Sequence, residues 1–248
     1  MNVKIKIFAI FVTVILLQNN SFSQTVSPLE IVSNSLGVKS SITNSLNYDR
    51  KKLPVGYEKE TMSALSNFPE LQNVPVKFRV KKSFATLKTK PAFFSMFKPR
   101  EHRTYVITIS NKTIQKLMPI TFANLPENAR IGIIGHELSH VVDFSKKTTW
   151  QSFKVAFGHL NKHYMDSLEF HTDKICIDHG LGKDLETWSS FIRNTMHTVF
   201  WRGADYVNKV DTHFERYMNP STIEKYIKAD SATINARLTM QDSEDSRL

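Results

Sequence analysis

The sequence has little cysteine, little glycine and no long apolar run beyond its first residues, and each shortage excludes a class of protein. Cys176 is the single cysteine, so the chain cannot close an internal disulfide and is not a disulfide-stapled scaffold. With 8 glycines and 9 prolines among 248 residues, collagen-like and low-complexity chains are excluded. Apolar residues make up 41% of the chain, which is enough for a hydrophobic core and excludes wholesale disorder.

Acidic residues are also scarce relative to basic ones. The 33 Lys and Arg residues outnumber the 23 Asp and Glu residues and give a formal net charge of +10. Nine of the basic residues and one acidic residue lie within residues 77–103. One interpretation is a patch for an anionic partner; the interpretation that we favour is a set of solvated strand and loop side chains. No helix-turn-helix, zinc-finger or RNP-like motif accompanies the charge, so we expect no specific nucleic-acid partner.

The first 23 residues have the layout of a secretory signal peptide. Lys4 and Lys6 form a positive start, and an apolar run of about 11 residues follows from Ile7 to Leu17. Ser21 and Ser23 are small residues at the two positions that a signal peptidase reads. The apolar run is shorter than the roughly 20 residues that span a bilayer. We therefore expect cleavage after Ser23, a secreted or periplasmic location, and no transmembrane segment in the mature chain.

The rest of the chain predicts one α+β domain, with strands early and helices late. Residues 24–56 predict a loosely structured lead-in, residues 57–236 the folded domain, and residues 237–248 a frayed polar tail. Gly180 is placed to end a helix, and we expect a monomer. Periodicity predicts helices over 57–71, 128–144, 162–179, 186–218 and 220–229, strands over 74–80 and 103–109, and a loop or hairpin over 83–100.

Residues 136–140 carry the motif with the most specific chemistry, His136-Glu137-Leu138-Ser139-His140. On a helix, residues four apart lie one turn apart on one face, so both imidazoles can reach one metal ion. Zinc accepts two neutral imidazoles and a carboxylate, and a catalytic site leaves the fourth position to water. Glu137 can then act as the general base that takes a proton from water as it attacks a carbonyl. The apolar residues around the motif predict a buried helix, in which these polar side chains need partners.

The third ligand distinguishes the classes of zinc site. Asp143 and Lys146 stand where a metzincin would have a glycine and a third histidine, so that class is excluded. Glu169 and Asp173 lie four residues apart on the helix predicted over 162–179. There Glu169 would be the third zinc ligand, and Asp173 would hydrogen-bond the outer nitrogen of a zinc-bound histidine.

Other potential ligands lie nearby and are weaker candidates. His171 is two residues from the expected third ligand and therefore lies on a different helix face. His159 and His163 belong to the connecting segment, and Asp143 is better interpreted as a solvated acid at a helix end. Cys176 lies in an apolar context without a base partner, so we expect a small core residue rather than a nucleophile.

A His-Glu-x-x-His helix that is followed after 28 intervening residues by Glu-x-x-x-Asp resembles the gluzincin clan of zinc metallopeptidases. The resemblance covers roughly residues 100–182 and implies a zincin-like fold, in which a small sheet packs on the active-site helix. It implies a peptide or protein substrate that pairs with an upstream edge strand, here the strand at 105–109. Many relatives have Ala before the Asp, where this chain has Thr172. The residue roles that it implies are zinc ligands at His136, His140 and Glu169, a general base at Glu137, and a hydrogen-bonding partner at Asp173.

Two further questions stay open at the level of the sequence. The clan usually adds a Tyr, His or Arg that stabilises the oxyanion, and the sequence does not choose among His197, Tyr206, His213 and Tyr217. The alternatives to a peptidase are a catalytically silent zinc-bound module of the same fold, and a basic surface-binding protein with a coincidental motif. The intact Glu137 favours the peptidase.

Overall fold

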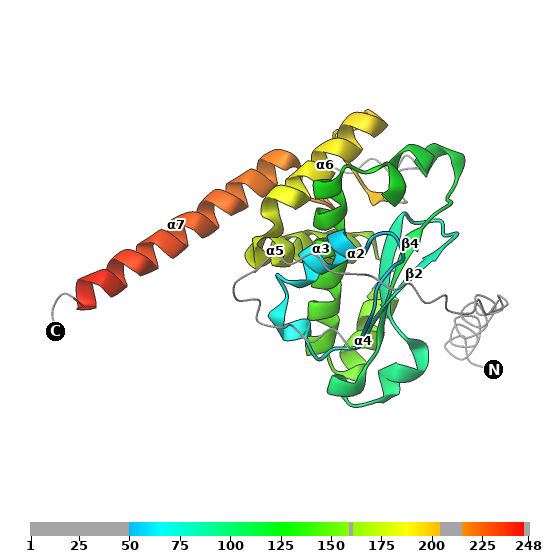
Figure 1. Cartoon of the computed structure of the whole chain (residues 1–248), viewed down its shortest axis with the longest axis horizontal. Coiled ribbons are helices and arrows are strands. Elements are labelled where there is room, and N and C mark those ends of the chain that lie inside the picture. The colour runs from blue at the N-terminus through cyan, green and yellow to red at the C-terminus, as the bar shows by residue number, and fades with distance from the viewer. Residues whose placement is uncertain (1–49, 159–160, 204–214, 246–248) are drawn as a thin grey trace, which may run out of the picture. The chain divides into compact units, whose positions relative to one another are not determined.

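The computed structural model describes residues 50–158, 161–203 and 215–245, and these lie in one compact unit, Asn44–Leu248. The expected signal peptide lies outside the described residues. The fold is α+β, as the sequence predicts, with a four-stranded sheet and mostly helical structure after it (Figure 1). No helix in the described part of the chain is both long and apolar enough to cross a bilayer.

The sheet consists of β1 (Lys51–Lys52), β2 (Val76–Lys81), β3 (Leu87–Pro91) and β4 (Tyr105–Ser110), in the order β1-β2-β4-β3. β1, β2 and β4 run parallel, whereas β3 pairs with β4 antiparallel. The two predicted strands are confirmed, and the predicted loop or hairpin over 83–100 supplies β3. Since β1 lies within residues 24–56, the ordered structure begins before the boundary that we expected at residue 57.

The two faces of the sheet have different chemistry because side chains alternate along each strand. The inward-facing residues Val76, Phe78, Tyr105, Ile107 and Ile109 are 3% exposed or less and belong to the hydrophobic core. Lys77 and Arg79, one position along, are exposed on the outer face. One face of the sheet therefore packs on the helices and the other carries basic side chains.

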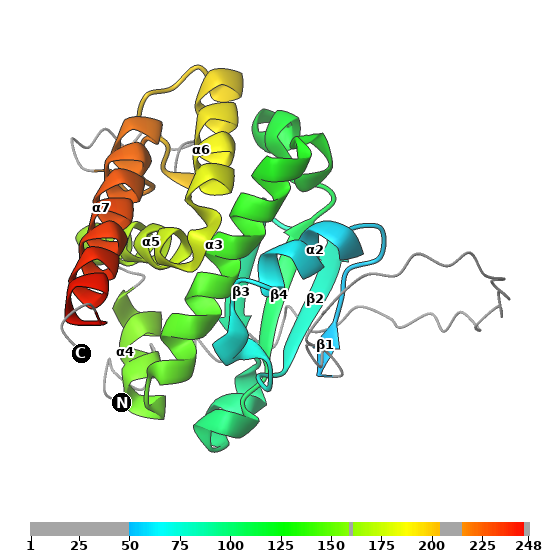
Figure 2. The same ribbon diagram turned by 60° about the vertical axis from the view of Figure 1, so that its left-hand side comes forward.

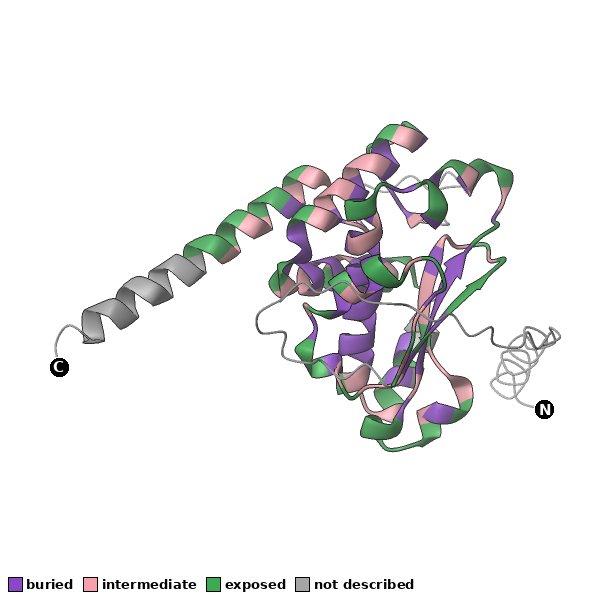
Figure 3. Ribbon diagram, in the orientation of Figure 1, coloured by how far each residue is buried: buried purple, intermediate pink, exposed green. Residues whose placement is uncertain are grey.

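The central helix is α3 (Glu127–Lys146), which lies between the sheet and the later helices (Figures 1 and 2). It is buried almost continuously from Gly132 to Phe144, as the purple ribbon in Figure 3 shows. A Cβ atom at Gly132 would overlap the backbone carbonyl of Asp184, so a glycine is needed where α3 approaches α6. The other helices are α2 (Glu58–Leu65), α4 (Thr149–Gly158), α5 (Lys162–Cys176), α6 (Gly182–Met196) and α7 (Pro220–Asp245).

Several helix ends differ from the predictions, each for a local reason. α2 ends at Leu65, and Pro69 begins a separate 3-10 turn after Phe68, whose backbone is non-helical, as is favoured before a proline. Gly180, at a φ of 80°, interrupts the helical backbone between α5 and α6, as expected. The helix predicted over 186–218 ends at Met196, because His197 adopts a left-handed conformation with a φ of 50°.

Two helical segments lie where the sequence predicts none. α4 was not predicted, and it follows α3 after a short break. α7 begins at Pro220, as expected, but its backbone stays helical to Asp245 instead of ending near residue 229. The segment 237–245, which we expected to be part of a frayed tail, is therefore helical.

Candidate metal centre

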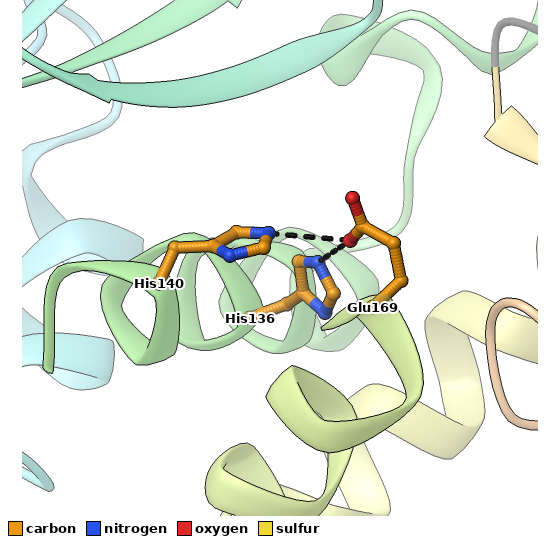
Figure 4. A group of neighbouring side chains, drawn as sticks. All are labelled: His136, His140 and Glu169. Carbon is orange, nitrogen blue, oxygen red and sulfur yellow. Dashed lines mark hydrogen bonds and ion pairs between the residues drawn. The ribbon is translucent and has the colours of Figure 1, made fainter. Parts of the chain in front are cut away.

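The described structure brings His136, His140 and Glu169 together at the interface of α3 and α5. Oε2 of Glu169 lies 3.1 Å from Nε2 of His136 and 3.2 Å from Nε2 of His140. All three potential ligand atoms lie within 4.8 Å of one another, and all three residues are buried. Figure 4 shows the two imidazoles pointing from α3 toward the carboxylate. The three residues that the sequence predicts as ligands thus form a group that could hold a metal ion.

Asp173 orients His136. One of its carboxylate oxygens lies 2.7 Å from Nδ1 of His136, and the other accepts a hydrogen bond of 2.7 Å from the backbone N–H of Met218. A carboxylate can only accept from this imidazole, so Nδ1 carries a proton and Nε2 is the ring nitrogen that faces the centre, where a metal ion would replace its proton. The structure therefore places Asp173 in the position that the sequence predicts.

Thr172 orients His140 in the same way, which the sequence analysis missed. The Thr172 hydroxyl donates to the backbone carbonyl of Leu168 at 2.9 Å and lies 3.2 Å from Nδ1 of His140. Because its one proton is used, the hydroxyl oxygen must accept from Nδ1 of His140. Nε2 of His140 is then also the ring nitrogen that faces the centre. The sequence did place Thr172 next to Asp173 on α5. Its contact with His140 could not be predicted, because it depends on how α3 and α5 pack.

The electrostatics of the group favour positive charge at its centre. Burial alone would lower the pKa of His136, but hydrogen bonds to Asp173 and Glu169 outweigh it and raise that pKa to about 10. Burial likewise opposes the charge on Glu169, yet the two histidines hold the pKa of its carboxyl far below the ordinary value. The Glu169 carboxylate thus stays ionised and stabilises a cation beside it.

Glu137 lies beside the group, on the same helix as the two histidines. Its side chain is buried, and its Oε2 has no hydrogen-bond partner among the described residues. Burial raises the pKa of this carboxyl above the ordinary value, as a proton acceptor working near neutral pH requires. Its backbone carbonyl accepts a hydrogen bond from the Thr89 hydroxyl at 3.2 Å, which connects α3 to β3.

A cleft runs along β3 on both sides of Glu137. His140, Glu169 and Thr89 line a cavity of about 200 Å³, and His136 and Trp188 line a smaller cavity of about 50 Å³. Ala85, Leu87, Glu137 and Tyr217 line both cavities. The cleft therefore passes the unpartnered carboxylate and the three potential ligands.

The edge strand beside this cleft is not the one that the sequence predicts. β4, at residues 105–110, lies between β2 and β3 and is fully buried, so it cannot bind a peptide along its side. β3 has one neighbour, β4, among the described strands. The expectation for 105–109 is thus wrong. The sequence alone did not show that β3, which precedes β4 in the chain, lies beyond β4 at the edge of the sheet.

The remaining candidates are separated by their positions. His163 and His171 are exposed and line a different groove, between α5 and α7. Asp143 is buried rather than solvated, contrary to our expectation, and it pairs with Lys147 just after the end of α3. Cys176 is buried, and burial raises its pKa well above the ordinary value, in keeping with a core residue. His159 lies outside the described residues.

Among the candidates for oxyanion stabilisation, Tyr217 is the one that lines the cleft. Its ring centroid lies 5.6 Å from that of His136 and 5.6 Å from that of Trp188. Loss of solvent contact raises the pKa of Tyr217 well above the ordinary value, so its hydroxyl keeps its proton and can donate a hydrogen bond. His197 ends α6 and lines neither cavity; Tyr206 and His213 lie outside the described residues.

Comparisons with protein-family models, with curated proteins and with solved structures found no match. The donor set itself fits a transition metal, because two imidazole nitrogens and one carboxylate oxygen converge in a buried site.

Proposed function

We propose that this protein is a zinc-dependent peptidase of the gluzincin type, with the zincin-like fold that its motif implies. The observation that carries the proposal is the position of Glu137, whose buried and unpartnered carboxylate oxygen lies in the cleft beside the three converging ligands. A helix that only needed a folded core would not retain such a group, because an unpartnered buried carboxylate oxygen is costly.

His136, His140 and Glu169 would hold the ion, and their chemistry favours zinc. Two imidazoles and one carboxylate are a known ligand set for catalytic zinc, which keeps one position open. When bound, zinc polarises a carbonyl and lowers the pKa of a water molecule to about 7. Asp173 and Thr172 hold both rings with Nδ1 as the outer donor and Nε2 toward the centre, so a metal ion would replace a proton at Nε2 without rotation of either ring.

The chain's own residues supply the proton transfers and the charge stabilisation. Glu137 accepts a proton from the attacking water and then delivers it to the departing amine, which its raised pKa permits. The protonated Tyr217 hydroxyl would donate a hydrogen bond to the oxyanion that forms at the attacked carbonyl.

The open edge of β3 would hold an extended peptide in the cleft. At the two ends of the β3–β4 ladder, the carbonyl of Thr86 accepts from the N–H of Ser110, and the N–H of Ala92 donates to the carbonyl of Thr104. Because such pairs alternate along an antiparallel ladder, the backbone groups of Leu87 and Thr89 point to the open side. A substrate strand can pair with these groups whatever its side chains are. The expected signal peptide, with cleavage after Ser23, would deliver the enzyme out of the cytoplasm to such substrates.

The experiment is hydrolysis of an unstructured protein, such as casein, by the purified mature chain loaded with zinc. We expect cleavage that a chelator abolishes and that returned zinc restores. Glu137→Gln should retain zinc and lose at least about 100-fold in rate, since general acid–base catalysis contributes roughly that much. Cleavage by Glu137→Gln at the wild-type rate would refute the assignment of the base. Wild-type protein that binds zinc but cleaves nothing would instead indicate a catalytically silent module.

A further inference from the structure

The outer face of the sheet gathers basic side chains from three strands. Lys52, Lys77 and Lys90 lie in one row across the sheet, with Val106 of β4 between the last two. Arg79 and Lys88 flank Thr108 in the next row, and Lys81 lies beside Ser110 in the row after that. We call this the basic face, made up of the six side chains of Lys52, Lys77, Arg79, Lys81, Lys88 and Lys90.

Charge on the basic face is not neutralised within the described structure. None of the six side chains forms an ion pair with a described residue, whereas exposed lysines elsewhere, such as Lys183 and Lys228, pair with glutamates. Partial burial lowers the pKa of Lys88 and Lys90, and Lys81, close to both, lowers it further. Lys52 and Lys77 lie directly opposite each other on adjacent strands, where like charges destabilise a sheet, so the fold tolerates a cost here that an anionic partner would remove.

Three large aromatic side chains are exposed at the end of the same sheet. Phe94 and Phe97, in the 3-10 helix η2 (Phe93–Phe97), are 76% and 65% exposed, and Trp150 of α4 is 68% exposed. The Thr149 hydroxyl donates to the backbone carbonyl of Met96 at 3.1 Å and so holds α4 against η2. Since η2 follows β3 directly, it lies at the lower end of the sheet (Figure 2). We call these three residues the aromatic corner.

Basic side chains and exposed aromatic rings together fit a membrane surface. Lys and Arg are attracted to anionic headgroups, and Trp and Phe insert at the boundary between headgroups and acyl chains. Binding of single-stranded nucleic acid would need aromatic rings among the charges to stack the bases, but the neutral positions of the basic face are Val106, Thr108 and Ser110. We propose that the basic face and the aromatic corner dock this protein on an anionic lipid bilayer.

This docking surface lies mostly apart from the proposed metal centre. The basic face is on the side of the sheet opposite to α3, which carries two of the three potential ligands, and of its six residues Lys88 also lines the larger cavity of the cleft. The proposal therefore stands or falls without the peptidase, and its test uses no substrate.

Tryptophan fluorescence gives a direct readout. The chain has 3 tryptophans, and Trp188 and Trp201 are only 5% and 4% exposed, so a change in emission on docking reports Trp150. We expect the emission of the mature protein to shift to shorter wavelength with vesicles of phosphatidylcholine and phosphatidylglycerol. We expect no shift with phosphatidylcholine alone, and none for Trp150→Phe with either vesicle.

Cosedimentation with the same vesicles tests the charges. The triple variant Lys77→Gln, Arg79→Gln, Lys81→Gln changes exposed β2 residues that line neither cavity of the cleft, and we expect its vesicle affinity to fall by at least about tenfold. The matched control is Lys183→Gln, Lys225→Gln, Lys228→Gln on α6 and α7, which lie on the other side of α3 (Figure 2), and it should bind like the wild type.

Three results would overturn the proposal. One is equal binding to neutral and anionic vesicles, and another is wild-type vesicle affinity in the β2 triple variant. The third is displacement of the protein from anionic vesicles by a single-stranded oligonucleotide or a sulfated glycan at equal anion concentration, which would identify a polyanion as the preferred partner.

Discussion

The hydroxyl oxygen of Thr172 lies 3.2 Å from Nδ1 of His140, one residue before the carboxylate that lies 2.7 Å from Nδ1 of His136. Two consecutive residues of α5 thus orient the two histidines of α3. Each turns an Nε2 atom toward Glu169, which lies one turn earlier on α5. The whole donor arrangement therefore depends on the packing of two helices.

Removal of the Thr172 hydroxyl should weaken the metal site without unfolding the protein. Thr172→Ala frees the ring of His140 to rotate or change tautomer, and we expect zinc affinity to fall by about tenfold, as for other partners of metal-bound histidines. Competition with a chromogenic chelator measures the affinity. Thr172→Ser keeps the hydroxyl and should bind zinc like the wild type, so equal weakening in both variants would contradict this role.

Tyr217→Phe should slow catalysis and spare the metal. The ring stays beside His136 and Trp188 while the hydrogen-bond donor is lost. We expect kcat to fall by roughly 100-fold, as for the loss of one oxyanion donor, with KM and zinc content nearly unchanged. Steady-state kinetics on a fluorogenic peptide measure kcat and KM, and metal analysis of the same sample measures the zinc content. An unchanged kcat would exclude the Tyr217 hydroxyl from the reaction.

Gly132→Ala should destabilise the fold. A Cβ atom at this position would overlap backbone atoms of Asp184 and Leu185, which cannot move as a flexible side chain can. We expect the free energy of unfolding in urea to fall by about 1–3 kcal/mol or more. Asn128→Ala, an exposed position on the same helix, is the control and should change stability by less than about 0.5 kcal/mol. Wild-type stability in Gly132→Ala would contradict the close approach of α3 and α6.

Asp166 should make stability depend on pH. Burial would raise the pKa of its carboxyl, but Oδ1 accepts hydrogen bonds from Arg202 at 2.6 Å and Arg216 at 2.8 Å, and the pKa is lowered overall. A lowered pKa in the folded state stabilises the protein above the ordinary carboxyl pKa of about 3.9, and this stability is lost as the pH falls below it. Urea unfolding should show Asp166→Asn less stable by about 3 kcal/mol at pH 7, with the difference shrinking below about pH 4. A difference that does not shrink would contradict the ion pair.

The sequence predicted the parts of the site that depend on local spacing. His136 and His140 share a face of α3, and Glu169 and Asp173 share a face of α5, because residues four apart do so on any helix. It did not predict that β3 is the edge strand, because strand order depends on contacts between residues far apart in the chain. The end of α6 was missed for a similar reason: the Arg193 side chain on α6 donates to the backbone carbonyls of Val199 and Tyr217, which stabilises the non-helical segment after it.

The most direct test of the central claim is the zinc content of the mature protein after zinc loading and removal of free metal, measured by mass spectrometry of the element. The account predicts one zinc per chain in the wild type and in Glu137→Gln, and a large loss in His136→Ala, His140→Ala and Glu169→Ala. A wild type without zinc, or a Glu169→Ala variant that retains a full equivalent, would contradict it.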